Sequence, residues 1–247
     1  MSTTTIAVIN QKGGQGKTPT VANLGSALAR AGHTTLLCDV DPTGSLSEYW
    51  LSEESDELET TIYNALMETR RIEPTAIQKR LGLLPAHDEL AVAEVDLPKK
   101  DEGQLRLARV LDLYDDYEYR VIDCPPGLGI LSINAIAAAD SLLIPVKCEI
   151  SAQRALKRIY RIIEAVRQAD NPHVEVKWIL PTLFDGRKKH HQAVLRAIQA
   201  LYPDKVYPEI SKETTKYNDA WTEGTDISFI DKELGHYWDR LAATFGS

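Results

Sequence analysis

A seven-residue run, KGGQGKT at residues 12–18, constrains this chain more than any other feature. It follows an apolar, β-branched stretch at residues 6–9, which is typical of a buried strand, and it precedes a helix predicted for residues 21–30. Glycines let successive backbone N–H groups turn inward toward phosphate oxygens, and a helix N-terminus favours negative charge. The run therefore predicts a phosphate-binding loop, in which Lys17 reaches the β- and γ-phosphates and the Thr18 hydroxyl binds Mg²⁺.

The loop departs from the common phosphate-loop pattern in two ways. The pattern G-x-x-x-x-G-K-[ST] needs glycine at position 11, where this chain has Gln11. The chain also carries an additional cation, Lys12, directly before the glycines. We therefore interpret the loop as a variant whose extra lysine requires its own explanation.

Apolar runs alternate with amphipathic stretches over most of the chain, and this alternation predicts the fold class. Strands are predicted at residues 6–9, 34–38, 81–84, 119–122, 142–146, 174–180 and 205–207, and helices at 21–30, 62–67, 105–114, 151–168, 188–202 and 230–245. Such an order is typical of an α/β fold with a mostly parallel, twisted sheet and helices on both faces. An acidic stretch at residues 52–59 is predicted to be a solvated connection or a helix start. Without repeats or a Gly/Ser linker, residues 1–247 are predicted to form one domain.

Three aspartates follow predicted strands. Asp39 and Asp41 come after the second strand, and Asp123 ends the fourth. Because the carboxyl ends of parallel strands meet at one edge of a sheet, we expect all three beside the phosphate loop. Carboxylates there can hold Mg²⁺ directly or through water. A single aspartate after a strand is more often a turn former or helix cap, but three at one edge favour a metal and hydrolysis site.

Composition excludes several other classes of protein. Among 247 residues, 43% are apolar and 26% charged, which is too apolar for a disordered chain. No apolar run reaches about 18 residues, the length that a membrane span needs, and the first ten residues do not resemble a signal peptide. Three cysteines are typical of a reducing compartment, so we expect a cytoplasmic protein. A net charge of −8 argues against a protein that coats nucleic acid with its whole surface.

The sequence resembles the ParA/MinD group of deviant Walker A P-loop ATPases, and within it the ParA/Soj branch. The resemblance rests on KGGQGKT (12–18), DVDP (39–42), LGLLPA (81–86), VIDCPPGLG (121–129), IPVKCE (144–149) and LPTLFD (180–185). It implies that ATP and Mg²⁺ are the cofactors. It also implies that Lys12 is the signature lysine, which crosses a dimer interface to the partner's nucleotide.

The resemblance implies roles for further residues. Lys17 and Thr18 match the phosphate lysine and the Mg²⁺ ligand, Asp41 the aspartate that orients the attacking water, and Asp123 the Walker B position. Asp39 matches a residue that supports the metal site. The nucleotide is expected to contact Lys12, Gly13, Gly14, Gln15, Gly16, Lys17, Thr18, Pro19, Pro181, Thr182 and Pro208.

Pro19 is a departure from the family pattern, which usually has Thr or Ser after the position of Thr18. Proline is tolerated in the first turn of a helix, but it has neither an N–H nor a hydroxyl to donate to the α-phosphate. We therefore expect weaker nucleotide binding than a Pro19→Thr variant would show.

The resemblance also implies an ATPase cycle. A protein of this kind forms a homodimer on ATP, binds DNA without sequence preference, associates with the nucleoid, and is released when a ParB-like or other adaptor stimulates slow hydrolysis. It would partition or position a plasmid, a chromosome or a protein cargo. Strand one begins near residue 4, so we expect no additional N-terminal DNA-reading domain.

Two sets of basic residues are candidates for contacts with DNA phosphates. The first lies in the C-terminal third and consists of Lys188, Lys189, Lys212 and Lys216. The second forms a stripe along the helix predicted at 151–168 and consists of Arg154, Lys157, Arg158 and Arg161. We interpret the stripe as a solvated helix face, because charge runs are weak indicators of function, and we take the first set as the DNA candidates.

Alternative functions belong to other classes. A MinD-like membrane-cycling ATPase would need a terminal basic amphipathic helix, but the C-terminal residues have core spacing, so we expect no membrane partner. An iron–sulfur relative would need paired cysteines, whereas Cys38, Cys124 and Cys148 are better interpreted as buried small residues. A scaffold that holds ATP with little turnover would not need Asp41.

Overall fold

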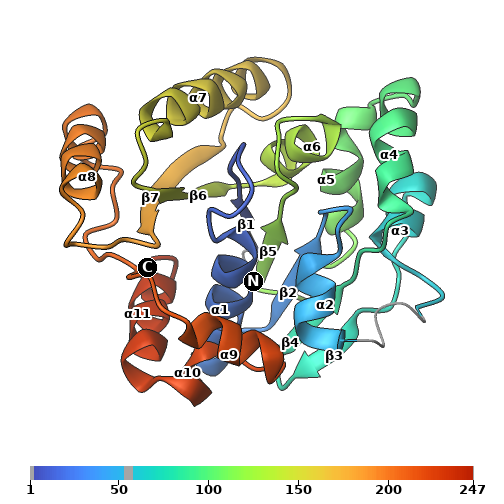
Figure 1. Cartoon of the computed structure of the whole chain (residues 1–247). Helices are drawn as coiled ribbons and strands as arrows, with labels where there is room; N and C mark the ends of the chain where they lie inside the picture. The colour runs from blue at the N-terminus through green and yellow to red at the C-terminus, as the bar shows by residue number, and fades with distance from the viewer. Residues whose placement is uncertain (1–2, 53–57, 247) are drawn as a thin grey trace.

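A computed structural model describes residues 3–52 and 58–246 and has a seven-stranded sheet at its centre (Figure 1). The strand order is β3-β4-β2-β5-β1-β6-β7. The strands are β1 (Thr4–Val8), β2 (Thr35–Asp39), β3 (Thr75–Gln78), β4 (Leu81–Leu84), β5 (Tyr119–Asp123), β6 (Ser141–Lys147) and β7 (Glu175–Thr182). Every pairing is parallel except that of the edge strand β3 with β4. The predicted α/β class with a mostly parallel sheet is thus confirmed.

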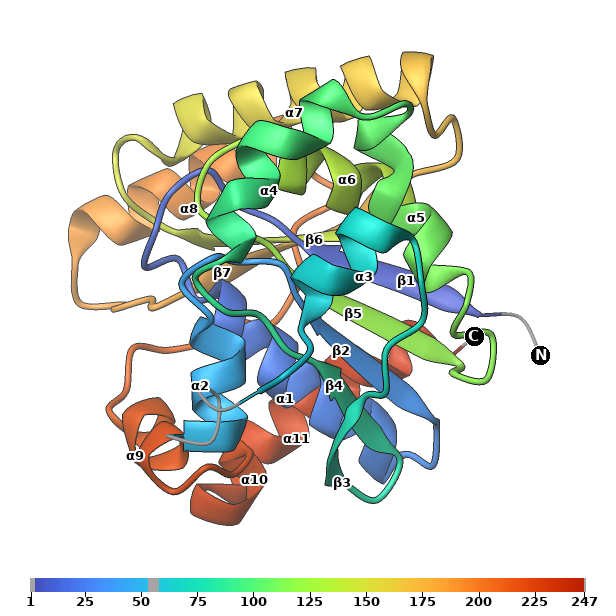
Figure 2. The same cartoon turned by 90° about the vertical axis from the view of Figure 1, so that its right-hand side faces the viewer.

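Helices cover both faces of this sheet (Figure 2). One face carries α3 (Ile62–Glu68), α4 (Leu90–Asp96), α5 (Arg106–Leu111), α6 (Ile130–Ala138), α7 (Ala152–Ala169) and α8 (Lys189–Leu201), with 3₁₀ turns η2 (Leu97–Lys99) and η3 (Gly103–Leu105) between α4 and α5. The other face carries α1 (Lys17–Arg30), α2 (Ser45–Leu51), α9 (Lys216–Thr222), α10 (Ile227–Ile230) and α11 (Lys232–Ala243).

Alternation along the central strand explains why there are two separate cores. In β1 and its extension, Ala7 and Ile9 face the core beneath α3–α8, whereas Ile6 and Val8 face the core beneath α1 and α11. Successive side chains of a strand point to opposite faces, so a strand that is buried on both sides reads as one continuous apolar run. The two cores fix the sheet rigidly, and its carboxyl edge is where β1, β2 and β5 deliver the predicted site residues.

Several expectations about individual elements were wrong or incomplete. Residues 205–207 do not form a strand, because Val206 makes only an isolated bridge to Ile179. The helix predicted at 230–245 is divided at Asp231, whose side chain accepts from the Leu234 N–H and caps α11. Strand β3 was missed, and so were the short helices α2, α4, α6, α9 and α10. Residues 53–57 of the acidic stretch lie outside the described residues.

Candidate nucleotide site

The glycine-rich loop joins β1 to α1, as predicted. Gly14 and Gly16 have φ values of 67° and 86°, a left-handed conformation that residues with a Cβ rarely adopt. Helix α1 begins at Lys17 without a side-chain cap and without an acidic residue in its first turn. Its first backbone N–H groups are therefore free to bind an anion.

Contacts from neighbouring strands hold the loop in place. The Gln15 side-chain oxygen accepts from the Lys147 N–H at 2.9 Å, and the Thr182 hydroxyl donates to the Gln15 carbonyl at 2.9 Å. The Gly127 N–H donates to the Gln11 carbonyl at 3.0 Å. Three different connections at the carboxyl edge thus fix the backbone that would surround the phosphates.

The predicted metal ligands lie together. The Thr18 hydroxyl donates to Asp123 Oδ2 at 2.7 Å. The other carboxylate oxygen of Asp123, Oδ1, is buried and has no hydrogen-bond partner among the described residues. A buried, unsatisfied carboxylate oxygen beside a hydroxyl fits a Mg²⁺ site, because Mg²⁺ takes one or two protein oxygens and completes its shell with water and phosphate. Consistent with that sparse ligand set, no group of three or more His, Cys, Asp and Glu in residues 3–52 and 58–246 is arranged to hold a metal.

Asp39 is committed to the turn after β2. Its Oδ1 accepts from the Asp41 N–H at 3.1 Å, and its Oδ2 accepts from both the N–H and the hydroxyl of Ser47, at 2.9 and 2.7 Å. These bonds favour a positioning role for Asp39 rather than direct contact with a metal. Asp41 is also buried, and its Oδ1 accepts from the Thr43 N–H at 3.0 Å. The role of Asp41 in orienting water stays a prediction.

Burial shifts the pKa values of these carboxyl groups. Desolvation raises the pKa of Asp39 to about 6, despite its hydrogen bonds to Ser47 and Asp41. Desolvation and the neighbouring Asp39 carboxylate also raise the pKa of Asp123 well above its usual range, against the hydrogen bond from Thr18 and the charge of Lys17. Lys17 is itself buried. The edge thus concentrates negative charge that a bound cation would neutralise.

The Lys12 side chain contacts the loop that follows β6 in the same chain. Its ammonium donates to the Ser151 hydroxyl and lies 3.8 Å from Glu149 Oε2. Its side chain is 42% exposed, so only part of it is enclosed. The sequence indicated neither partner, because both are distant in the chain. Ile150, between them, is 87% exposed and presents an apolar side chain beside the phosphate loop.

A pocket of about 240 Å³ lies beyond the loop on the side of Pro19. Thr182 lines it, as expected for a nucleotide contact, whereas Pro208 is exposed and is not among its lining residues. Pro181 is buried and accepts from the Ser211 N–H through its carbonyl. The other lining residues that sequence reasoning missed are Thr20, Leu183, Ser211, Thr214, Tyr217, Asn218 and Trp238. The nucleoside contact of Pro208 therefore has no support from this geometry.

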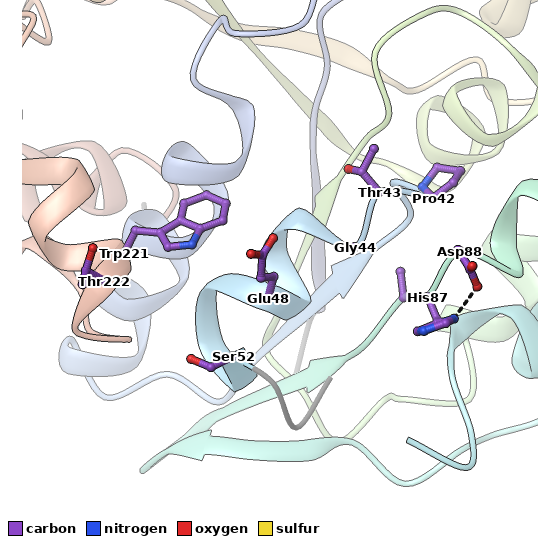
Figure 3. A pocket seen from close by; sticks show the side chains of 10 residues that line it. Pro42, Thr43, Gly44, Glu48, Ser52, His87, Asp88, Trp221 and Thr222 are labelled. Atoms are coloured by element: carbon purple, nitrogen blue, oxygen red, sulfur yellow. Dashed lines mark ion pairs between the residues drawn. The ribbon is translucent and has the colours of Figure 1, made fainter. Parts of the chain in front are cut away.

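A second pocket, of about 470 Å³, adjoins the turn that carries Asp41 (Figure 3). Pro42 and Thr43 of that turn form one wall, Glu48 of α2 projects into the middle, and Trp221 of α9 lies opposite. The remaining side is formed by the loop after β4, where His87 pairs with Asp88. Any molecule that fills this pocket would touch the turn directly after Asp41.

The predicted DNA lysines differ in their surroundings. Lys188 lies 3.3 Å from Glu213 and 3.7 Å from Asp185, and Lys216 is ion-paired with Asp231. Lys189 and Lys212 are exposed, and neither makes an ion pair within the described part of the chain. The assignment of these four residues to DNA stays a prediction, and the ion pairs weaken it for two of them.

The three cysteines are buried and free, which confirms their interpretation as small core residues. Desolvation raises the pKa of Cys148 to about 11 and that of Cys124 well above the usual value, so the thiols stay protonated at neutral pH. Among the described helices, none has both the length and the apolar composition that a membrane span requires.

Comparison with known proteins identifies the relatives of this chain. Residues 3–176 match the AAA domain family. The chain is 38% identical to the chromosome partitioning protein ParA of Myxococcus xanthus, over 92% of this chain and 81% of that protein. It is 35% identical to the sporulation initiation inhibitor protein Soj of Bacillus subtilis, over 92% of this chain and 90% of that protein.

Two solved structures extend the comparison. Cobyrinic acid a,c-diamide synthase of Mycobacterium smegmatis, with bound ATP analogue and magnesium, is 35% identical, with a TM-score of 0.79 over 90% of this chain and 92% of the other. The ATP complex of a McdA variant from Cyanothece has a TM-score of 0.88 over 100% of this chain and 98% of the other. At 24% identity, the McdA complex shows only that the fold is shared.

Proposed function

The chain belongs to the AAA domain family, as a member of its ParA/Soj group of P-loop partition ATPases, and from this premise we propose that it is an ATP-dependent switch. In the proposed cycle, two subunits dimerise on ATP, the dimer binds DNA without sequence preference, and an adaptor of the ParB kind triggers hydrolysis and release. The switch would act in the cytoplasm, on the nucleoid, to partition or position a cargo.

The observation that carries the proposal is the unpaired Oδ1 of Asp123 beside the Thr18 hydroxyl, at the start of an uncapped helix. A buried carboxylate oxygen without a protein donor is suited to a cation, and an uncapped helix N-terminus is suited to an anion, so Mg²⁺ with a nucleoside triphosphate fits both. The bound magnesium would supply electrostatic neutralisation of the phosphates. Thr18 and Asp123 would hold it, while Lys17 and the backbone of residues 13–18 would bind the phosphates.

Hydrolysis requires a water molecule in line with the bond that breaks. Asp41 lies at the same edge, on a turn that Asp39 and Ser47 hold in place. A carboxylate fixed in this manner can accept a hydrogen bond from water and orient it for attack. The pocket beside Pro42 and Thr43 offers an adaptor a route to that turn.

Dimerisation is supported by Lys12 and its surroundings. In the single subunit, Lys12 binds Ser151 and Glu149 rather than residues around Thr18. Ile150, which is 87% exposed, lies between the two residues that Lys12 contacts, so a second subunit that approaches Lys12 would also meet this apolar side chain. We propose that dimerisation covers Ile150 and transfers Lys12 to the partner's nucleotide, where a second cation offsets the phosphate charge.

The partition assignment is favoured over the synthase named for the structural neighbour. Two relatives with partition or Soj names match 92% of this chain at 38% and 35% identity. The synthase structure, at 35%, supports the nucleotide part of the proposal through its ATP analogue and magnesium. The membrane-cycling alternative has less support, because the apolar side of α11, including Trp238 and Leu241, is buried in the core.

Steady-state phosphate release tests the enzymatic part of this proposal. The full chain should release phosphate slowly from ATP only when Mg²⁺ is present, and Asp41→Ala should bind ATP without releasing phosphate. Binding of ATP with no turnover in the wild type, even with DNA and adaptor added, would favour the scaffold alternative. Sedimentation with liposomes in the presence of ATP would instead support a membrane cycle.

A further inference from the structure

Helix α7 has an unusually basic exposed face in an acidic protein. It carries five cations and one carboxylate, Glu164, although the whole chain has a net charge of −8. Four of the cations are exposed and follow the i, i+3, i+4, i+7 spacing that aligns side chains along one side of a helix. We call them the α7 row: Arg154, Lys157, Arg158 and Arg161.

The four cations of the α7 row are unpaired within the part of the chain that the structure describes. Within residues 3–52 and 58–246, none of its four side chains makes an ion pair, a hydrogen bond or a contact with an aromatic ring. The one carboxylate of the helix is already engaged, since Glu164 accepts from Gln168 at 2.8 Å and lies 3.9 Å from Arg167. Four aligned cations that form no ion pair within the described residues repel one another, although Glu149 and Glu164 line the adjoining surface, and an external polyanion would relieve that repulsion.

Two of the four candidate lysines nearer the C-terminus differ from the α7 row in this respect, whereas Lys189 and Lys212 are unpaired within the described residues. Lys188 has two carboxylates within 4 Å, and Lys216 is paired with Asp231. A phosphate that binds these lysines must displace a carboxylate already in place. A phosphate that binds the α7 row displaces only water and small ions, which is the exchange that drives nonspecific binding to DNA.

We propose that the α7 row is the principal surface through which this protein contacts the DNA backbone. The inference rests on the proposed function, because that function supplies DNA as the polyanion. From Arg154 to Arg161 the row covers about 10 Å along the helix axis, long enough to reach about two or three phosphates of one strand. The solvated-face interpretation of this stripe is thereby replaced with a binding role.

The surroundings of the row favour a nucleic acid over a lipid surface. A helix that lies on a membrane inserts its apolar side between lipid headgroups. The apolar side of α7, including Leu156, Ile159 and Ile163, is buried against the sheet and cannot insert. Phosphate contacts with DNA need only the cationic side, which is the side that α7 exposes.

The position of the row also connects it to the nucleotide site. Helix α7 begins at Ala152, directly after Ser151, whose hydroxyl accepts from Lys12. Arg154 and Glu149 line the same surface pocket. A dimer would present two rows to the same DNA, so the second row binds at a high effective concentration and affinity rises on ATP.

The test compares two triple variants of the full chain that remove the same charge. One is Lys157→Gln with Arg158→Gln and Arg161→Gln, and the matched control is Lys188→Gln with Lys189→Gln and Lys212→Gln. Each is made in the Asp41→Ala background, so that ATP is retained. Anisotropy of a labelled random-sequence duplex is measured with Mg-ATP over a series of salt concentrations.

We expect the α7 triple variant to bind DNA more than about tenfold more weakly at low salt. The slope of log K against log salt should fall by about 0.9 for each phosphate that the variant no longer neutralises. The control triple should lose clearly less affinity than the α7 triple, because Lys188 already pairs with Glu213 and Asp185 and only two of its lysines are unpaired. ATP affinity and thermal midpoint should be the same in all three proteins; if the α7 triple does not fold, Arg158→Glu alone tests the row by the same readouts.

Three outcomes would overturn the proposal, and they are distinguishable. If the parent binds DNA and the α7 triple binds equally well, the row is not the contact surface, although the proposed function stands. If the parent dimerises on ATP but does not bind DNA, the DNA part of the proposed function fails and the row's role fails with it. If the row is needed for binding to anionic lipid vesicles but not to DNA, the partner is a membrane.

Discussion

The carboxyl edge of the sheet, which carries the candidate nucleotide site, and the α7 row both concentrate like charges, but they do so in opposite ways. At the edge, Asp39 and Asp123 are fully buried, and hydrogen bonds fix the carboxylates in single positions. On α7, Arg158 and its neighbours are exposed and make no ion pair or hydrogen bond with any side chain that the structure describes. A buried group that hydrogen bonds hold in one position recognises a small ligand of one shape, whereas a row of exposed cations suits a long polymer whose charges repeat. The difference indicates one site for a nucleotide and another for a polyanion.

The largest effect, a loss of ATPase rate, should come from removing the Lys17 charge at the carboxyl edge of the sheet. Lys17→Ala deletes the ammonium that we propose binds the phosphates, and we expect the rate of phosphate release to fall by roughly 100-fold. Arg161→Gln removes one charge from α7 and should leave the basal rate without DNA unchanged. A comparable loss of basal rate in Arg161→Gln would show that the two regions are not separable.

A second effect, on unfolding free energy, should distinguish the two buried aspartates at the carboxyl edge of the sheet, Asp39 and Asp123. Asp123→Asn removes a buried carboxyl group whose ionised form is disfavoured by burial and by Asp39, and we expect the ligand-free protein to gain up to about 1 kcal/mol in unfolding free energy, or roughly 2–4 °C in thermal midpoint. Asp39→Asn should instead destabilise it by about 1–3 kcal/mol, because an amide N–H would face the donors of Ser47 or Asp41. Thermal unfolding without nucleotide measures both, and a loss of stability in Asp123→Asn would contradict the metal-site interpretation.

A smaller effect, on ATP affinity, is expected from substitution of Pro19. Its ring leaves the first turn of α1 without one N–H and without a hydroxyl, both of which could bind the α-phosphate. Pro19→Thr should strengthen ATP binding by up to about tenfold, the equivalent of one additional hydrogen bond to a charged group. Titration with labelled ATP measures the change, with Pro19→Ala as the control for the hydroxyl. Equal ATP affinities for the wild type and the Pro19→Thr variant would contradict this expectation.

The smallest effect, on DNA affinity, should come from removing a carboxylate partner of Lys188. Glu213→Gln removes the carboxylate 3.3 Å from Lys188 and makes that region more like the α7 row. We expect DNA affinity to rise about twofold, since exposed ion pairs contribute about 1 kcal/mol or less. The anisotropy assay described for α7 measures it. A decrease in affinity would show that Glu213 itself supports the DNA contact.

Local features of the site were predictable from the sequence, because neighbouring residues determine them. The loop from Lys12 to Thr18 is one continuous segment, and its glycines and position after an apolar run indicate a phosphate loop. The aspartates after β2 and β5 were predictable for the same reason, since each ends a buried strand. Parallel topology then places Asp39 and Asp123 in register as neighbours.

Features that depend on distant contacts were not predictable. Lys12 and Ser151 are 139 positions apart, and no local pattern indicates that they meet. Strand β3 was missed because its half-buried sequence, Thr75–Gln78, lacks an apolar run, and it pairs only at the sheet's edge. The significance of the α7 row also depends on tertiary structure, because a basic stripe is informative only once its lack of carboxylate partners is visible.

The mass of the ATP-bound protein in solution tests the central claim most directly. Analytical ultracentrifugation of Asp41→Ala with Mg-ATP should give a dimer, twice the 27.5 kDa of one chain. The same protein without nucleotide, and a Lys12→Ala, Asp41→Ala variant with Mg-ATP, should both give the single-chain mass. A single-chain mass for Asp41→Ala at saturating Mg-ATP, with ATP binding confirmed, would contradict an ATP-driven dimeric switch.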